Sequence, residues 1–338
     1  MEKKSMNPIK VSVCVSFYNA EKFVKRCLDM LCAQSMKEGL EIVLVNDGSK
    51  DNTEELMRNY ATNHPERPFV LVSQENGSLC QGRKTGINHA SGEYITFLDQ
   101  DDLIDASAYE KMYNCAKEYD SDIVEIMTKH GDEVLGAPFS GLQDSHLVLK
   151  HFFEKGGLQS QLWMRMYKRT LFQKSVLPDR YTNNEDMYGM PCLLHAAHSI
   201  YFIKEALHTY SVDNADSFMA SMTDPKKAER RYQSRKIALG SFEHFKSFVS
   251  VDGMQEYNEE YNHFKARYIF TFLITKFPSK SMTTKMEDVF DETDIPNRKA
   301  LNAFLRRWLK NDISINRLYK VLGLDITYFF YNLRKNLI

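Results

Sequence analysis

Short apolar runs of strand length recur through the first part of the chain, separated by stretches with helical spacing. The runs are rich in Val, Ile and Phe and nearly continuous, as in strands that are buried on both faces. We predict strands over residues 11–17, 41–45, 69–73, 94–98 and 122–127. Helices are predicted over residues 51–60, 79–90 and 106–119, and after an N-cap at Asn19.

Strands that alternate with helices of this length indicate an α/β domain whose sheet is mostly parallel and flanked by helices. From about residue 224 the sequence pattern changes. Charged residues are interspersed with aromatic ones, and runs of β-branched residues become rare. We therefore predict an α/β domain over residues 1–220 and a helical domain over 221–338.

The net charge, the cysteine spacing and the length of the apolar runs argue against several classes of protein. The chain has 338 residues with a net charge of −1, which argues against a nucleic-acid partner. Its six cysteines form no C-x-x-C pair, as expected for free thiols in a reducing cytosol. No apolar run approaches the roughly 18 residues of a membrane helix, and no signal-peptide pattern opens the chain. We expect a cytoplasmic protein.

Polar residues follow the first two predicted strands, at the edge where open α/β sheets bind ligands. Phe17 and Tyr18 end the first strand and could stack on a base; the alternative is an ordinary strand end before a helix cap. Asp47 ends the second strand and could accept the imide N–H of a uracil ring. The alternative there is a turn, because Asp-Gly is a common turn dipeptide.

The third strand leads to Asn76 and Gly77, and the next helix opens with Arg83 and Lys84. Backbone N–H groups at a helix start together with an arginine suit a diphosphate. The alternative is a surface loop with a solvated Arg-Lys pair. The first strand is followed by no glycine-rich fingerprint, which argues against an NAD enzyme and a nucleotidyltransferase.

An acidic cluster ends the fourth strand. Asp99, Asp101 and Asp102 lie within four residues, and a divalent cation such as Mn²⁺ or Mg²⁺ would relieve their repulsion. The alternative is a solvated acidic turn. Glu185 and Asp186 follow much later, where a carboxylate could remove a proton from an attacking hydroxyl.

Five segments in this order resemble the family 2 glycosyltransferases of the GT-A (Rossmann-like) fold: VSVCVSFYNAEKF, EIVLVNDGSKDNT, QENGSLCQGRKTGIN, GEYITFLDQDD and NNEDMYG. The resemblance covers roughly residues 10–215. It implies an inverting hexosyltransferase that moves a sugar from a nucleotide-sugar donor to an acceptor hydroxyl, with a divalent metal.

The resemblance also implies roles for individual residues. Those assigned to the donor are Phe17, Tyr18, Asn19, Asp47, Asn76, Arg83, Asp99 and Ser217, the last in a lid loop. Asp99 and Asp101 form the D-x-D pair, with Asp101 in direct contact with the metal. Asp186 is the catalytic base, and Glu185 lies beside it in the acceptor site.

The chain departs from the family pattern at three positions. Ser16-Phe17 replaces a common proline, Asn46-Asp47 replaces paired aspartates, and Ser211 stands where many members carry a basic residue at the lid. The Q-x-x-R-W signature of processive synthases is absent, so we expect one sugar to be added per encounter.

We expect a UDP-sugar donor carrying a hexose or an N-acetylhexosamine. The expected acceptor is a glycan, a lipid-linked glycan or a glycoprotein in bacterial surface polysaccharide or glycoconjugate synthesis. Two alternatives stay open: a nucleotide-sugar-binding protein without transfer activity, and a nucleotidyltransferase of related fold. Trp163 could stack on an acceptor sugar or pack in the core.

The segment 298–338 carries nine basic and two acidic residues, a net charge of +7, with aromatic residues among them. A basic, aromatic-rich helix can lie on an anionic membrane. We therefore weigh peripheral contact with the inner face of the cell membrane against two alternatives: a helical subdomain that packs its aromatics inward, and a homo-oligomer interface.

Overall fold

The computed structural model describes residues 8–155, 160–173, 175–180, 182, 184–211, 228–274 and 282–309. The chain divides into two compact units. Unit 1 comprises Met1–Phe152 and Gly157–Pro225, and unit 2 comprises Phe153–Gly156 and Lys226–Ile338. Each unit is considered by itself.

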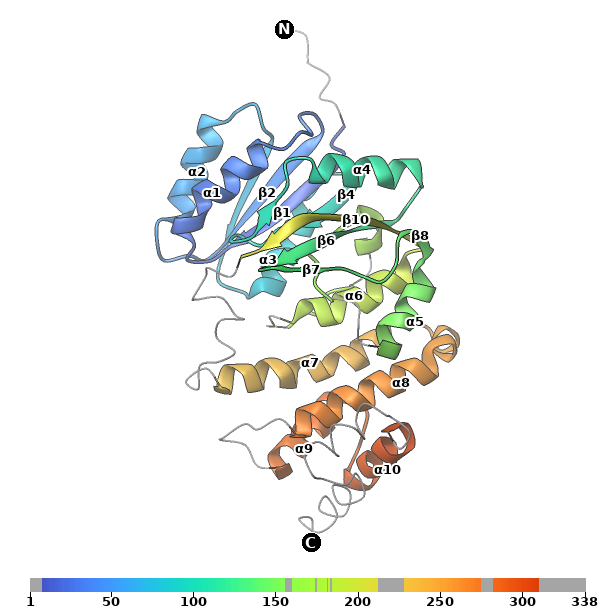
Figure 1. Cartoon of the computed structure of the whole chain (residues 1–338). Coiled ribbons are helices and arrows are strands. Elements are labelled where there is room, and N and C mark those ends of the chain that lie inside the picture. The colour runs from blue at the N-terminus through green and yellow to red at the C-terminus, as the bar shows by residue number, and fades with distance from the viewer. Residues whose placement is uncertain are drawn as a thin grey trace. The chain divides into compact units, whose positions relative to one another are not determined.

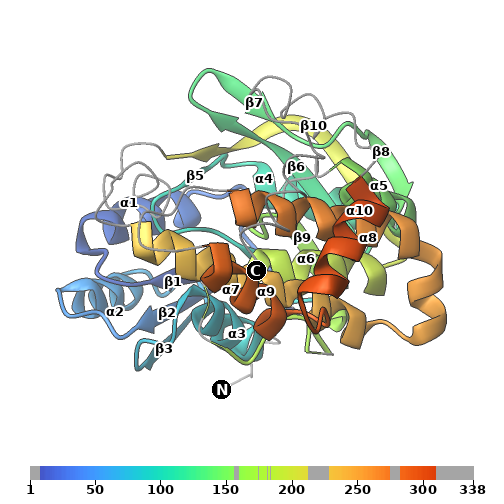
Figure 2. The ribbon, with the colours of Figure 1, turned by 90° about the horizontal axis from the view of Figure 1, so that it is seen from below.

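The described part of unit 1 is built on one ten-stranded sheet. The strands are β1 (Val11–Phe17), β2 (Leu40–Asp47), β3 (Phe69–Gln74), β4 (Tyr94–Phe97), β5 (Leu103–Ile104), β6 (Ile123–His130), β7 (Glu133–Leu135), β8 (Gly141–Asp144), β9 (Arg165–Lys168) and β10 (Ser199–Tyr210). Their order is β3-β2-β1-β4-β9-β6-β10-β5, with β7 paired to β6 and β8 to β10. Figure 2 shows β3 at one end of this sheet and β7 toward the other.

Helices cover both faces of the sheet. They are α1 (Glu21–Cys32), α2 (Thr53–Asn63), α3 (Leu79–His89), α4 (Ala108–Glu118), α5 (Ser145–Lys155) and α6 (Glu185–Ala196), with a 3₁₀ turn η1 (Arg169–Gln173). In Figure 1, α1, α2 and α4 lie on one face, and α3 and α6 on the other. Buried side chains of β1, β2, α1 and α4 form the main hydrophobic core of the unit.

The five predicted strands and the predicted helices are all present, within a few residues of the expected bounds. The α/β fold class is confirmed. The sheet itself is mixed rather than mostly parallel: β3, β2, β1 and β4 run parallel, whereas β9 pairs antiparallel with both β4 and β6. The antiparallel strands β7, β8 and β9 come from the segment after residue 128, for which the sequence pattern predicted no strands, and the two-residue β5, antiparallel to β10, follows shortly after β4.

One local prediction was wrong. Asn19 does not cap α1, whose N-cap is Ala20. Asn19 instead adopts a φ of 47°, a left-handed conformation that Asn tolerates better than most residues. Its side-chain Oδ1 accepts a hydrogen bond of 2.8 Å from the backbone N–H of Lys50. The residue therefore joins the turn after β1 to the turn after β2.

Unit 2 is helical, as predicted for the C-terminal region. It contains α7 (Ala228–Phe248), α8 (Val251–Ile274), α9 (Met282–Glu292) and α10 (Arg298–Leu309), and α8 contacts the other three. On α10, Leu301, Leu305 and Leu309 are buried in the core of this unit, whereas Lys299 and Arg307 are exposed. The apolar side of α10 thus packs inward, as in the packed-subdomain alternative, and the rest of the segment, 310–338, lies outside the described residues.

No helix in the described ranges combines the length and the apolar character that crossing a membrane requires. All six cysteines lie in described segments and are free thiols, as predicted.

Candidate active site

The sheet order brings the predicted strand ends together. β1 lies between β2 and β4, and all three run parallel, so their carboxyl ends meet at one edge. The turns beyond them are joined by hydrogen bonds: the Tyr18 N–H donates to Gln100 Oε1 at 3.1 Å, and the Asn19 N–H donates to Ser49 Oγ at 3.1 Å. Three of the motifs singled out in the sequence therefore form one surface.

The aromatic pair that ends β1 is split by the structure. The ring of Phe17 is fully buried in the hydrophobic core, whereas Tyr18 is 47 % exposed. Side chains alternate between the two faces along a strand, so neighbouring residues point in opposite directions. Stacking of both rings on a base, as the sequence suggested, is not available, and Tyr18 alone presents a ring at this edge.

Asp47 ends β2 with a buried carboxylate that accepts three hydrogen bonds from neutral donors. Its Oδ1 accepts from Gln74 Nε2 at 2.7 Å and from the Gly77 N–H at 2.9 Å, and its Oδ2 accepts from Asn76 Nδ2 at 3.1 Å. Gly48 makes this approach possible, because a Cβ there would lie 2.7 Å from the Asn76 backbone nitrogen. The predicted residues Asp47 and Asn76 are thus in direct contact.

Arg83, on α3, joins two elements that are distant in sequence. Its side chain is buried, and its guanidinium donates to Asp99 Oδ1 at 2.7 Å and to Glu185 Oε1. The guanidinium also lies 5.6 Å from the centre of the Phe97 ring. The sequence suggested that Arg83 reaches a diphosphate; the structure instead pairs it with two carboxylates, between the acidic turn after β4 and the start of α6.

Glu185 and Asp186 form the first turn of α6, where the helix dipole favours negative charge. Burial raises the pKa of Glu185 to about 7, with nearby Arg83 opposing the shift and Asp186 adding to it. Burial also raises the pKa of Asp186, again against the effect of Arg83. Asp186 Oδ1 accepts a hydrogen bond of 2.9 Å from the Met187 N–H.

The acidic turn after β4 is closed by a hydrogen bond of 3.1 Å from the Asp102 N–H to the Asp99 carbonyl. Asp99 and Asp101 are both partly exposed, and the carbonyl of Asp101 accepts from Arg26. Across the described residues, no group of three or more His, Cys, Asp or Glu side chains is arranged to hold a metal ion by itself.

Two functional candidates fall outside these contacts. Ser217, predicted to lie in a lid loop, is not among the described residues. Trp163 is 8 % exposed and stacks on His208 with ring centroids 4.2 Å apart, so it packs in the core rather than presenting a face to a sugar. The sequence reasoning missed His208 and the role of Asp102, whose Oδ2 lies 3.3 Å from His208 Nε2.

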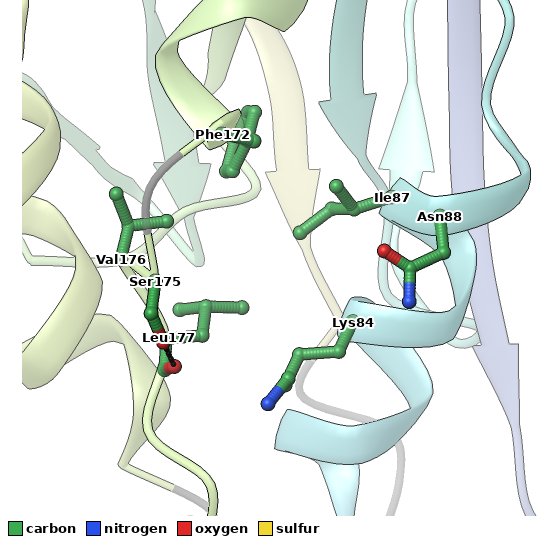
Figure 3. A pocket seen from close by; sticks show the side chains of 7 residues that line it. All are labelled: Lys84, Ile87, Asn88, Phe172, Ser175, Val176 and Leu177. Atoms are coloured by element: carbon green, nitrogen blue, oxygen red, sulfur yellow. Dashed lines mark hydrogen bonds between the residues drawn. The ribbon is translucent and has the colours of Figure 1, made fainter.

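A cavity of 230 Å³ lies on the flank of α3 (Figure 3). In the close-up, Lys84, Ile87 and Asn88 project from α3 toward the segment that carries Val176 and Leu177. The lining residues are Lys84, Ile87, Asn88, Phe172, Ser175, Val176 and Leu177. Lys84 pairs with Asp179, six residues before Glu185 on the segment that leads into α6.

Comparison with known proteins decides the family. Residues 12–179 match the family model "Glycosyl transferase family 2", which covers the strand ends described above. The chain belongs to glycosyltransferase family 2. The resemblance to the family 2 glycosyltransferases noted in the sequence is thereby confirmed.

Two curated relatives and one solved structure illustrate the similarity. "Glycosyltransferase GlyA" of Streptococcus pneumoniae is 28 % identical over 216 residues, which are 60 % of this chain and 30 % of that protein. "Minor teichoic acid biosynthesis protein GgaB" of Bacillus subtilis is 32 % identical over 178 residues, 47 % of this chain and 20 % of its own length. This chain thus matches less than a third of either relative.

The solved structure is S. aureus TarS 1–349 in complex with UDP-GlcNAc. It superposes with a TM-score of 0.60 at 19 % sequence identity, over 88 % of this chain and 81 % of that one. At this identity the likeness shows the fold alone, and that fold is the predicted GT-A arrangement of this family 2 glycosyltransferase.

Proposed function

We propose that this glycosyltransferase moves a hexose or an N-acetylhexosamine from a UDP-sugar to an acceptor hydroxyl, with inversion and with a divalent metal. The observation that carries the proposal is the cluster around Arg83. One guanidinium brings Asp99 of the acidic turn to Glu185 of α6, beside Asp186. Arg83 therefore links Asp99, which we expect near the donor's diphosphate, to Glu185, which we expect near the acceptor.

The uridine preference rests on the geometry of Asp47. An ionised carboxylate offers about four lone-pair sites, and three are used by Gln74, Asn76 and Gly77. The remaining site, on Oδ2, can accept the imide N–H of a uracil ring, while Tyr18 offers an exposed ring nearby. The structural neighbour TarS binds UDP-GlcNAc, which supports the same donor class here.

The acidic turn has the donor set for Mn²⁺ or Mg²⁺. Its carboxylates are hard oxygen ligands, and Mg²⁺ commonly takes one or two carboxylates plus substrate phosphates. Arg83 pairs with Asp99 and Glu185 and lies close to Asp186, so one guanidinium faces three carboxyl groups. We assign Asp101 and Asp99 to hold the metal, which when bound would neutralise charge on the departing nucleoside diphosphate.

Asp186 is assigned as the general base, and Glu185 stands beside it. The acceptor oxygen attacks the anomeric carbon as the bond from that carbon to the diphosphate oxygen breaks, and Asp186 takes the hydroxyl proton. A raised pKa makes Asp186 a better proton acceptor, because catalytic bases work best near the operating pH. Such a base typically contributes about 10²–10⁴-fold to the rate.

The acceptor class is proposed by analogy with a relative. GgaB is named as a minor teichoic acid biosynthesis protein, which supports a bacterial surface glycan as acceptor. A lipid-linked glycan or a glycoprotein as acceptor stays a prediction. Peripheral membrane contact through residues 298–338 and self-association stay predictions. On the described part of that segment, exposed Lys299 and Arg307 could meet an anionic surface, whereas the apolar residues face the core.

A donor screen tests the proposal. UDP-, GDP- and TDP-linked sugars would be incubated with MnCl₂, and release of the nucleoside diphosphate measured with and without EDTA. We expect release from a UDP-sugar that EDTA abolishes and that Asp101→Asn also abolishes, while Asp132→Asn, at an exposed turn, leaves it unchanged. Full activity in excess EDTA would contradict the metal, and binding of UDP-sugars without turnover would favour the non-catalytic alternative.

A further inference from the structure

Asp102 is a buried carboxylate that follows directly after the D-x-D pair. Its Oδ1 accepts a hydrogen bond of 2.8 Å from the Ser211 N–H, and its Oδ2 lies 3.3 Å from His208 Nε2. Its own N–H closes the acidic turn on the Asp99 carbonyl. One residue therefore binds both the turn that carries Asp99 and Asp101 and the end of strand β10.

His208 is held firmly in the sheet. It is fully buried on β10, and its backbone pairs with Ile104 of β5 on one side and Thr128 of β6 on the other. Its imidazole stacks on the indole of Trp163, with ring centroids 4.2 Å apart and ring planes 20° apart. Trp163 lies just before β9, so the stack links the start of β9 to β10.

These contacts hold the acidic turn from two sides. Arg83 holds it through Asp99, and His208 holds it through Asp102. Polar groups that are buried without a polar neighbour are unfavourable, so the Asp102–His208 contact restrains where the turn can lie. Some residues contact and orient the ligands of a metal without binding the metal themselves. Replacing such a residue commonly lowers metal affinity by about 10–100-fold.

We propose that Asp102, His208 and Trp163 form a positioning array that sets the acidic turn for the metal–diphosphate of the donor. All three side chains are buried, so we assign Asp102 and His208 as positioning residues rather than catalytic ones. The inference rests on the proposed function, because it takes the acidic turn as the place where the donor's diphosphate binds.

Calorimetry with UDP and MnCl₂ tests the array without relying on turnover. His208→Phe keeps a ring that can stack on Trp163 but removes the contact with Asp102, and we expect UDP–Mn²⁺ binding to weaken by about 10–100-fold. His208→Gln keeps a polar group that can face Asp102 and should recover most of the affinity. His146→Phe is a matched control, because His146 also stacks on another ring, that of His195, but on α5.

A double-mutant cycle separates positioning from general damage. Asp102→Asn should weaken UDP–Mn²⁺ binding, and the double variant Asp102→Asn with His208→Phe should bind no worse than the weaker single variant. Additive losses would mean that the two residues act separately. If His208→Phe fails to fold, as judged by circular dichroism, the comparison of His208→Gln with Asp102→Asn carries the same test.

Fluorescence gives a direct readout of the array. The chain has two tryptophans, Trp163 and Trp308, so Trp308→Phe leaves Trp163 as the single reporter. We expect UDP with MnCl₂ to change Trp163 emission in this background, and His208→Phe to abolish the change. Folded His208 and Asp102 variants that bind UDP–Mn²⁺ with wild-type affinity would overturn the array and leave the proposed function intact. Absence of UDP binding by the wild-type protein would overturn both.

Discussion

Two carboxylate clusters meet at the carboxyl edge of the sheet, and they are stabilised in different ways. Asp47 is surrounded by neutral donors, namely the side-chain amides of Gln74 and Asn76 and a backbone N–H. Glu185 is buried against a guanidinium that it shares with Asp99. The first cluster connects neighbouring strand ends; the second connects α3 to a helix about a hundred residues later.

Under the proposed function, the difference would separate recognition of the nucleotide base from the transfer chemistry. Hydrogen bonds from neutral donors orient a carboxylate without neutralising its charge, which suits the recognition of a nucleotide base. The buried Glu185 carboxylate keeps a raised pKa although it pairs with Arg83. The stability of the folded protein therefore depends on that pair staying intact. Variants in the second cluster should therefore have large effects on rate and stability, and variants in the first should mainly change which nucleotide is bound.

The largest effect is expected at Asp186. Asp186→Asn cannot accept the proton of the acceptor hydroxyl, so transfer should fall by about 10²–10⁴-fold while UDP–Mn²⁺ binding stays near the wild-type value. Transfer is measured by UDP release in the presence of acceptor, and binding by calorimetry. Asp179→Asn, at an exposed position on the same segment, is the control. Near-normal transfer by Asp186→Asn would rule out the assignment.

Removal of Arg83 should destabilise the fold. Arg83→Met leaves Asp99 and Glu185 without their shared cation, and breaking a buried pair commonly costs about 3–5 kcal/mol. Urea unfolding would measure this. The control is Arg58→Met, because Arg58 pairs with Glu54 on the surface of α2, where such a pair contributes about 0.3–0.5 kcal/mol. Equal losses for the two variants would show that the Arg83 cluster is no more than a surface contact.

A third prediction concerns pH. The pKa of Glu185 is raised from 4.5 to about 7, so between these values the folded protein binds a proton that the unfolded chain has lost. Stability should be highest below about pH 4.5 with respect to this group and fall as the pH rises toward 7, by at most about 1.4 kcal/mol per pH unit. Unfolding of wild type and Glu185→Gln at several pH values checks it. A slope that persists in Glu185→Gln would assign the effect to other groups.

Much of the Asp47 cluster could be predicted from the sequence, because its residues lie at or just after strands that are recognisable as short apolar runs. The strands β1 to β4 are continuous apolar runs, and each is followed at once by the polar residues that end up at the shared edge. The parallel order of such strands places those residues together. Asp47 and Asn76 were accordingly found as candidates, and they touch.

The remaining contacts of the site depend on strands that the sequence pattern indicates only weakly. β9 has four residues, and β10 pairs with β6 through two register shifts that break the two-residue period of a strand. Neither was predicted, and the Asp102–His208–Trp163 contacts depend on both. The Arg83–Glu185 pair was also missed, because the path of the segment before α6 decides which carboxylate reaches the guanidinium, and no local pattern records that path.

The smallest and most specific effect is expected at Asp47. Asp47→Asn should weaken UDP–Mn²⁺ binding by roughly tenfold or more, since a hydrogen bond to a charged group contributes about 1.5–3 kcal/mol. It should also reduce the preference for UDP over GDP, because the Oδ2 lone pair assigned to the uracil N–H is replaced by an amide N–H that donates.

Gln74→Met is the control for this variant. It removes one neutral donor to Oδ1 but leaves Oδ2 as it is, so it should lower affinity slightly and keep the preference. Calorimetry with UDP, GDP and TDP on the three proteins separates loop damage from loss of base reading. TDP should follow UDP, because thymine presents the same N–H. A wild-type protein that binds GDP more tightly than UDP would contradict the assignment, and so would an Asp47→Asn variant whose nucleotide preference is unchanged.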